Sequence, residues 1–242
     1  MNHNIIPTAK VGLLCLSWLL FTQFLSSNKV VSPARCRKLV HIGTGIIYVM
    51  SWGLYPINDP SSRLYCSIIP ALVTFQFTLV GMGLLKDKKV VDSMSRSGNP
   101  RELLFGPATY GIIFVLSTII YWANSPVGIT ALSLLCFGDG FAGLIGSEFG
   151  RARIPYNRSK TIVGSVSFVI FSVVGSLMLL TIIQSYGYLI HFSLYAFIPS
   201  LIVVSIIGAI VESLPIEDWD NITVFMCCVL VLGWSNYDLL II

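Results

Sequence analysis

Long apolar runs recur along the whole chain and leave little sequence from which a soluble core could be built. A helix needs roughly 20 mostly apolar residues to cross the hydrocarbon core of a bilayer. The 242 residues have room for eight such runs, the last of which is the weakest because Asn236 and Asp238 interrupt its end. We expect spans at about 5–25, 39–57, 65–85, 103–123, 127–149, 162–183, 188–211 and 222–241. The pattern predicts an all-α, polytopic integral membrane protein with seven or eight transmembrane helices.

The composition supports this prediction, because only 11% of the residues are charged, whereas soluble domains carry about a quarter. No repeat, low-complexity tract or soluble domain interrupts the apolar runs, so we expect one membrane-embedded domain over residues 1–242. The first run lacks a clear small-residue cleavage site, which favours a retained helix over a signal peptide. The expected location is a bacterial inner or thylakoid membrane, or a eukaryotic organelle membrane. The six cysteines form no Cys-x-x-Cys pair and are interpreted as packing residues.

The basic residues gather in three of the loops between the expected spans. With eight spans these loops share one side of the membrane, and they hold 13 of the 15 Lys and Arg residues. Loops rich in Lys and Arg face the cytoplasm, so both termini are expected on the opposite side. The residues concerned are Lys29, Arg35, Arg37, Lys38, Lys86, Lys88, Lys89, Arg96, Arg101, Arg151, Arg153, Arg158 and Lys160.

Two acidic features on the same side are not explained by topology alone. The fourth loop there, "ESLPIEDWDN" at 212–221, carries four acids and no base. Asp139 lies inside the fifth expected span, toward its end, within "FGDGFAGLIG". An ionisable side chain within a span is energetically costly and indicates a functional site.

Carboxylates beside clustered cations are typical of a site for a magnesium–nucleotide complex. Mg²⁺ is commonly held by one or two carboxylates together with substrate phosphates, and Lys and Arg offset the charge of phosphates during phosphoryl transfer. Glycines at 138, 140, 143, 146 and 150 could let backbone approach a phosphate, although glycine is also common in membrane helices. The chain has no Gly-x4-Gly-Lys-Ser/Thr motif, which excludes a P-loop kinase.

The segment "GDGFAGLIGSEFGRARIPYNRSKTIVGS" resembles the nucleotide motif of the membrane polyprenol kinases, a family that includes dolichol, phytol and farnesol kinases. The spacing around "PYN" is more similar to phytol kinase, as are "RKLVHIGTG" (37–45), "GPATYGIIF" (106–114), "YWANSPVGI" (121–129) and "ESLPIEDWDNITV" (212–224). The sequence departs from phytol kinases at Gly143, where they usually have aspartate, and at Ser147 and Glu148, where they usually have arginines. Matches to the family pattern are Asp139, Ala142, Gly146, Gly150, Arg153, Lys160, Thr161 and Gly164.

The resemblance implies a CTP-dependent kinase that phosphorylates the hydroxyl of an isoprenoid alcohol with the help of Mg²⁺. Phytol is the first expected substrate, and farnesol or geranylgeraniol are others. In the phytol kinase branch the product, phytyl phosphate, enters tocopherol synthesis. The implied partners are CTP and a prenyl alcohol that comes from the bilayer, with no nucleic acid.

The candidate site residues fall into three overlapping groups. Asp139, Lys160 and His41 are the expected catalytic residues, with His41 as a possible base for the alcohol or as a histidine hydrogen-bonded between helices. The expected metal ligands are Asp139, Glu212, Asp220 and Asn221, although a solvated acidic loop would carry the same acids. The expected nucleotide-binding residues are Gly138, Gly140, Ala142, Gly146, Gly150, Arg153, Arg158, Lys160, Thr161 and Gly164.

Two other functions stay open at the level of sequence. A phosphatidate cytidylyltransferase also uses CTP in a membrane, but it releases pyrophosphate and forms a CDP-lipid. A transporter would also need an ionisable residue within a span, but transporter sites lie near mid-bilayer between broken helices. The charges of this chain gather instead at one face, which favours an enzyme.

Overall fold

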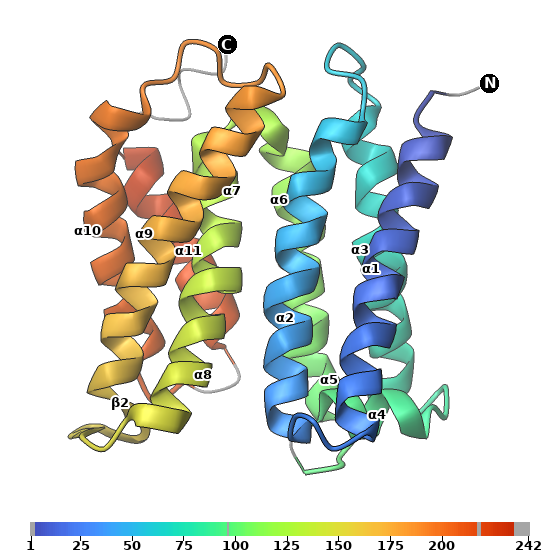
Figure 1. Ribbon diagram of the computed structural model, residues 1–242, viewed down its shortest axis with the longest axis vertical. Helices are drawn as coiled ribbons and strands as arrows, with labels where there is room; N and C mark the ends of the chain where they lie inside the picture. Colours follow the sequence, from blue (N-terminus) through green and yellow to red (C-terminus); the bar gives the residue numbers. More distant parts are fainter. Residues whose placement is uncertain (1–2, 96, 217–218, 235–242) are drawn as a thin grey trace.

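The computed structural model describes residues 3–95, 97–216 and 219–234, and within them the protein is a bundle of long helices that run side by side (Figure 1). Their bounds are α1 Ile5–Ser27, α2 Pro33–Met50, α3 Ser62–Gly81, α4 Lys88–Met94, α5 Glu102–Phe105, α6 Pro107–Ile120, α7 Pro126–Ser133, α8 Gly140–Phe149, α9 Ile162–Ser185, α10 Leu194–Glu212 and α11 Asp220–Trp234. Short 3₁₀ turns follow α2 and α6 at Ser51–Leu54 and Trp122–Asn124, and a π-helical turn, η3, joins α7 to α8 at Leu134–Asp139.

The predicted polytopic all-α fold is confirmed. In the part of the chain that the structure describes, six helical segments are long and apolar enough to cross a membrane, and α11 is a shorter apolar helix. The chain is a multi-pass integral membrane protein. The expected end of the last span, 235–241, lies outside the described residues. The six segments are Ile5–Ser27, Ser62–Gly81, Glu102–Ile120, Pro126–Phe149, Ile162–Ser185 and Leu194–Glu212.

Helix α2 begins several residues before the expected span at 39–57, because local signals start it early. The Ser32 side chain accepts a hydrogen bond from the Arg35 amide, and Pro33 occupies the first turn. A capping serine followed by proline is a strong helix start. The early start brings Arg37 and Lys38, which the sequence placed in a loop, onto the helix that also carries His41.

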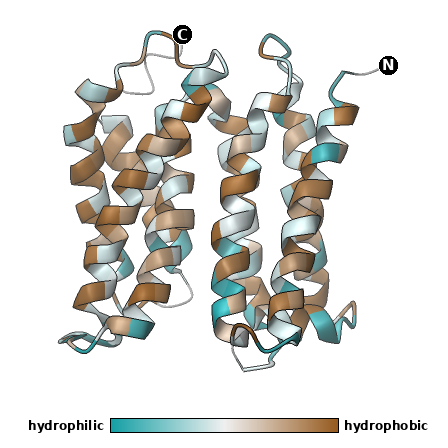
Figure 2. Cartoon of the chain, viewed as in Figure 1, coloured by the Kyte–Doolittle hydropathy of each residue, from teal (hydrophilic) through white to brown (hydrophobic). Residues whose placement is uncertain are grey.

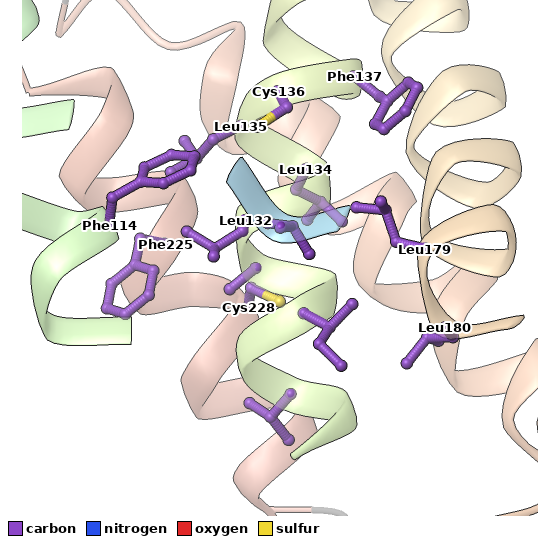
Figure 3. Packing of buried hydrophobic residues seen from close by; sticks show 14 of the residues in the cluster. Phe114, Leu132, Leu134, Leu135, Cys136, Phe137, Leu179, Leu180, Phe225 and Cys228 are labelled. Atoms are coloured by element: carbon purple, nitrogen blue, oxygen red, sulfur yellow. The ribbon is translucent and has the colours of Figure 1, made fainter. Parts of the chain in front are cut away.

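The continuous segment α7–η3–α8 forms the centre of the bundle. In its most apolar stretch of 18 residues, 78% is buried within the protein, compared with 17% for the corresponding stretch of the peripheral helix α1. Figure 3 shows Leu132, Leu134, Leu135 and Phe137 of this segment packed among side chains of neighbouring helices. A π-helical turn is rare and is often found at functional sites. Here the turn ends at Asp139, so the most buried helical segment of the bundle delivers the carboxylate that the sequence singled out within a span.

The connections at one end of the bundle contain more structure than the sequence predicted. A β-hairpin, β1 Arg153–Ile154 and β2 Asn157–Thr161, joins α8 to α9, and α4 occupies part of the expected loop 86–102. Figure 1 shows β2, α4 and α5 at the same end, opposite to the start of α1. Figure 2 shows hydrophilic residues at this end and hydrophobic residues along the middle of the helices. The basic loops therefore share one face, as the charge pattern predicted.

Candidate active site

Asp139 lies between two helices and is held by two basic side chains from α2. Its Oδ2 atom is 3.0 Å from Lys38 Nζ and 3.3 Å from His41 Nε2. Lys38 and His41 are three residues apart, a spacing that places them on the same face of a helix. The Asp139 carboxylate is 13% exposed, which is compatible with a buried charge because opposite charges offset the cost of burial.

His41 is positioned by the π-helical turn. Its Nε2 atom is 3.0 Å from the carbonyl oxygen of Leu135, and its ring lies against Tyr110 with a centroid distance of 4.1 Å. A carbonyl oxygen only accepts hydrogen bonds, so Nε2 carries the proton and donates it toward Leu135 and Asp139. His41 thus orients Asp139 through Nε2, and only Nδ1 can act as a base. The expected role of His41 in deprotonating the alcohol stays a prediction.

Lys160 forms a second charged pair on the other side of the site. Its ammonium group contacts the carboxylate of Glu212, the last residue of α10. Burial on its own lowers the pKa of Lys160, but the nearby carboxylates of Glu212 and Asp139 more than offset burial and raise that pKa above its usual value. Lys160 is therefore a cation at neutral pH.

The hairpin that carries Lys160 is fixed to the end of α10. The Asn157 side chain donates hydrogen bonds to the carbonyl oxygens of Ser213 and Leu214, at 3.1 and 3.2 Å. The Tyr156 hydroxyl lies 2.7 Å from Ser213 Oγ. These bonds hold the basic hairpin beside the start of the acidic segment, as the sequence predicted from charge alone. Glu217 and Asp218 of that segment lie outside the described residues.

Both charged pairs open into one cavity of about 990 Å³. This volume lies at the upper end of the range for ligand pockets. The cavity brings together residues from α2, α8, β2, α9, α10 and α11 that are far apart in the sequence. The expected site residues that line it are His41, Asp139, Ala142, Gly146, Arg153, Lys160, Thr161, Gly164, Glu212, Asp220 and Asn221.

Four expected nucleotide-binding residues do not line the cavity, namely Gly138, Gly140, Gly150 and Arg158. The three glycines instead allow close packing. A Cβ atom on Gly138 would lie 2.4 Å from Ser172 Oγ, and one on Gly140 would lie 2.3 Å from Ile42 Cγ1. One on Gly150 would lie 2.3 Å from the carbonyl oxygen of Gly146. Small residues let membrane helices approach closely, so the geometry explains these glycines without a ligand.

Sequence reasoning missed two residues of this site. Lys38 pairs with Asp139 but was interpreted only as a charge that sets topology. Its spacing of three residues from His41 was the available signal. Ser165 lines the cavity, and its buried hydroxyl has no hydrogen-bond partner among the described residues. A buried hydroxyl without a partner calls for an explanation such as an absent ligand, and no sequence pattern distinguished Ser165 from the other serines of α9.

The residues at the polar end of the cavity fit Mg²⁺ only together with a phosphate ligand. Among the described residues, no group of three or more His, Cys, Asp or Glu side chains is gathered closely enough to hold a metal ion. The four expected ligands therefore do not form a complete ligand set by themselves. However, Asp139, Glu212, Asp220 and Asn221 offer oxygen atoms to the same cavity. Mg²⁺ prefers oxygen and in nucleotide sites keeps water and phosphate ligands, so this donor set suits a metal that arrives with a nucleotide.

Comparison with known proteins identifies the family. The probable chloroplastic phytol kinase 3 of Glycine max is 36% identical over 237 residues, which cover 94% of this chain and 71% of that protein. The chloroplastic phytol kinase 1 of Arabidopsis thaliana is 33% identical over 230 residues, covering 94% and 75% of the two chains. The chloroplastic farnesol kinase of Arabidopsis thaliana is 33% identical over 219 residues, covering 90% and 69%. No family model and no solved structure matches the chain. The names of these relatives agree with the family that the motif around Asp139 resembles. This chain belongs to the polyprenol kinase family of phytol and farnesol kinases.

Proposed function

We propose that this protein is a kinase that transfers the γ-phosphate of CTP to the hydroxyl of an isoprenoid alcohol. Phytol is the first expected acceptor, because most of the relatives are named phytol kinases, and farnesol and geranylgeraniol are further candidates. One observation supports the proposal most directly. A single cavity has a charged end, with Asp139 and Lys160, and an apolar continuation between membrane helices. A phosphate donor and a lipid alcohol require such a combination.

The roles of the charged residues follow from their places in the cavity. Lys160, Arg153 and Ser165 line the part of the cavity that would hold the donor phosphates. Asp139 Oδ2 is occupied by Lys38 and His41, so Oδ1 is the oxygen that would accept the alcohol proton or a metal ion. Thr161 caps α9 by accepting a hydrogen bond from the Gly164 amide at 3.0 Å and so fixes the chain next to Lys160.

A bound Mg²⁺ would neutralise phosphate charge during transfer. Asp139, Glu212, Asp220 and Asn221 are the residues that would hold it. Asp139 and Glu212 belong to separate ion pairs, and Asp220 and Asn221 lie at the start of α11. The protein would therefore supply single oxygen atoms from several elements. Binding of a metal therefore depends on the phosphates that join these elements.

Membrane location follows from the family and from the fold. The relatives are named as chloroplastic proteins, which makes a plastid membrane, or the thylakoid membrane of a bacterium, the proposed location. Because the basic loops and the charged end of the cavity share one face, we expect the nucleotide to enter from the cytoplasmic or stromal side. The alcohol enters from the bilayer.

The decisive test follows the label of radioactive CTP. The purified protein, in nanodiscs, receives phytol, Mg²⁺ and CTP that is labelled at either the α or the γ phosphate. We expect only the γ label in the lipid product, with less product from ATP and none when EDTA removes Mg²⁺. A lipid that carries the α label would instead show cytidylyl transfer. The variant Asp139→Asn serves as the negative control.

A further inference from the structure

The cavity continues from the charged end into the half of the bundle formed by α1, α2, α3 and α6. On α1 the lining residues are Gly12, Cys15, Leu16 and Leu19, a spacing that defines one face of a helix. Only this face of α1 lines the cavity, although most of that helix lies exposed at the surface of the bundle. The face consists of small and apolar groups and carries no charge that could bind a nucleotide.

Helix α2 connects the charged and the apolar parts of the cavity. Its lining residues begin with Arg37 and Lys38 and continue through His41 and Gly45 to Tyr48. Ten residues separate Lys38 from Tyr48, which corresponds to about 15 Å along a helix. The apolar part of the cavity therefore reaches roughly half of the way across a hydrocarbon core of about 30 Å.

The far end of the cavity is closed by aromatic side chains. Tyr48 and Phe114 are the last lining residues of α2 and α6, and their rings lie 5.6 Å apart. The Tyr48 hydroxyl is fixed by a hydrogen bond of 2.9 Å to Thr118. Behind them Trp52 stacks on Trp122 at 5.1 Å. These buried rings form an end wall held by its own packing.

We propose that this apolar part of the cavity is the slot for the isoprenoid chain of the acceptor alcohol, and that its end wall limits the length of that chain. The hydroxyl lies near Asp139, and the far end of the chain lies against Tyr48 and Phe114. This inference rests on the proposed function, because it assumes a lipid alcohol as substrate. The slot is continuous with the charged site, so the reacting group and the chain are bound within a single cavity.

Gly12 is the residue that most sharply tests the slot. It lines the deep part, and a Cβ atom there would lie 3.2 Å from Ile69 Cδ1 on α3, so a larger side chain has to fill the slot or displace the Ile69 side chain. Cys15 lines the same face about one helical turn nearer to the charged end. Bulk at Gly12 should thus shorten the longest alcohol accepted, and bulk at Cys15 should shorten it further.

The experiment measures kcat/KM for geraniol, farnesol, geranylgeraniol and phytol in Gly12→Leu, Cys15→Phe and the control Leu14→Phe. Leu14 is 47% exposed and does not line the cavity. We expect Gly12→Leu to lower kcat/KM for phytol and geranylgeraniol by roughly tenfold or more while geraniol is retained. Cys15→Phe should also exclude farnesol, and Leu14→Phe should leave all four values unchanged. The slot would be overturned if Gly12→Leu lowered kcat/KM equally for all four alcohols. It would also be overturned if Leu14→Phe lowered kcat/KM selectively for the long alcohols, as expected for Gly12→Leu.

A second measurement tests the slot without any variant, in case a variant does not fold. Wild-type protein is cross-linked with phytol that carries a diazirine at the end remote from the hydroxyl. Labelling of the peptides that contain Tyr48 and Phe114 supports the slot, and labelling confined to α9 or α10 contradicts it. If the wild-type protein phosphorylates none of the alcohols, the proposed function fails. If the protein is active but the Gly12 and Cys15 variants keep the wild-type preference for alcohol length, only the slot is refuted.

Discussion

At the scale of single residues, the two oxygen atoms of Asp139 have different surroundings. Among the described residues, Oδ2 forms an ion pair with Lys38 and lies 3.3 Å from His41 Nε2, and no ion pair involves Oδ1. The carboxylate is thereby oriented before any substrate binds, and such preorganisation is a main source of catalytic power. The sequence predicted Asp139 because an ionisable residue within a span is unusual. It could not show which partners orient the carboxylate, because they come from another helix about 100 residues away.

Replacing Asp139 by asparagine should keep the protein folded and inserted but remove most of its Mg²⁺-dependent turnover. The substitution keeps the shape of the side chain and removes the charge that would hold a metal ion or accept a proton. Steady-state rates at saturating CTP and phytol provide the measurement. Activity within about threefold of the wild type, or roughly 0.65 kcal/mol, would mean that Asp139 is not a principal ligand or base.

Replacing Lys160 by alanine should lower kcat/KM by about ten- to 150-fold, the loss that corresponds to a charge-assisted interaction of roughly 1.5–3 kcal/mol. Lys160→Arg should recover only part of the loss, since a planar guanidinium does not reproduce a compact ammonium group. Arg151→Ala is the matched control, because Arg151 precedes the same hairpin, is exposed and does not line the cavity. Equal losses in both alanine variants would show that the charge of the loop, and not a specific contact of Lys160, is responsible.

At the scale of helices, hydropathy predicted the positions of the spans but not their irregular parts. Apolar length alone is sufficient to place α9, which was expected at 162–183 and spans Ile162–Ser185. The π-helical turn at Leu134–Asp139 had no signal in the sequence, because a change from one helical hydrogen-bond pattern to another leaves hydrophobic periodicity almost unchanged. The hairpin at 153–161 is too short and too polar to show a strand pattern. Both features position candidate site residues, so the arrangement of the candidate site could not be predicted from hydropathy.

The glycines of the motif provide a prediction about helix packing. Gly138→Ala should destabilise the protein by about 1–3 kcal/mol, the usual effect of overpacking, because the new Cβ would collide with Ser172 Oγ on α9. The Ser172 hydroxyl is buried without a hydrogen-bond partner among the described residues, so Ser172→Ala should cost little and should partly rescue Gly138→Ala. The thermal stability of the wild type, both single variants and the double variant, measured in detergent, completes the double-mutant cycle. A changed KM for CTP with unchanged stability would indicate instead that Gly138 contacts the nucleotide.

At the scale of the whole molecule, the charged end of the bundle should lie on one side of the membrane. Single cysteines in place of the exposed residues Lys89, Arg158 and Pro215 should react with an impermeant maleimide from the cytoplasmic or stromal side. A cysteine in place of the exposed Asn58, at the opposite end, should react only from the other side. The expectation rests on the distribution of Lys and Arg. Opposite labelling of positions 158 and 215 would separate Lys160 from Glu212 and rule out a single site.

The shared cavity has a consequence for the order of chemical events. Because the charged end and the chain slot are parts of one space, both substrates can be present together, and phosphate can pass directly from donor to acceptor without a phosphorylated enzyme. Initial-rate plots against one substrate at several fixed levels of the other should therefore intersect. Parallel lines, or exchange of label between CTP and CDP in the absence of alcohol, would indicate a phosphorylated enzyme intermediate. Direct transfer would also mean that no phosphorylated enzyme forms, so water would have no covalent intermediate to hydrolyse.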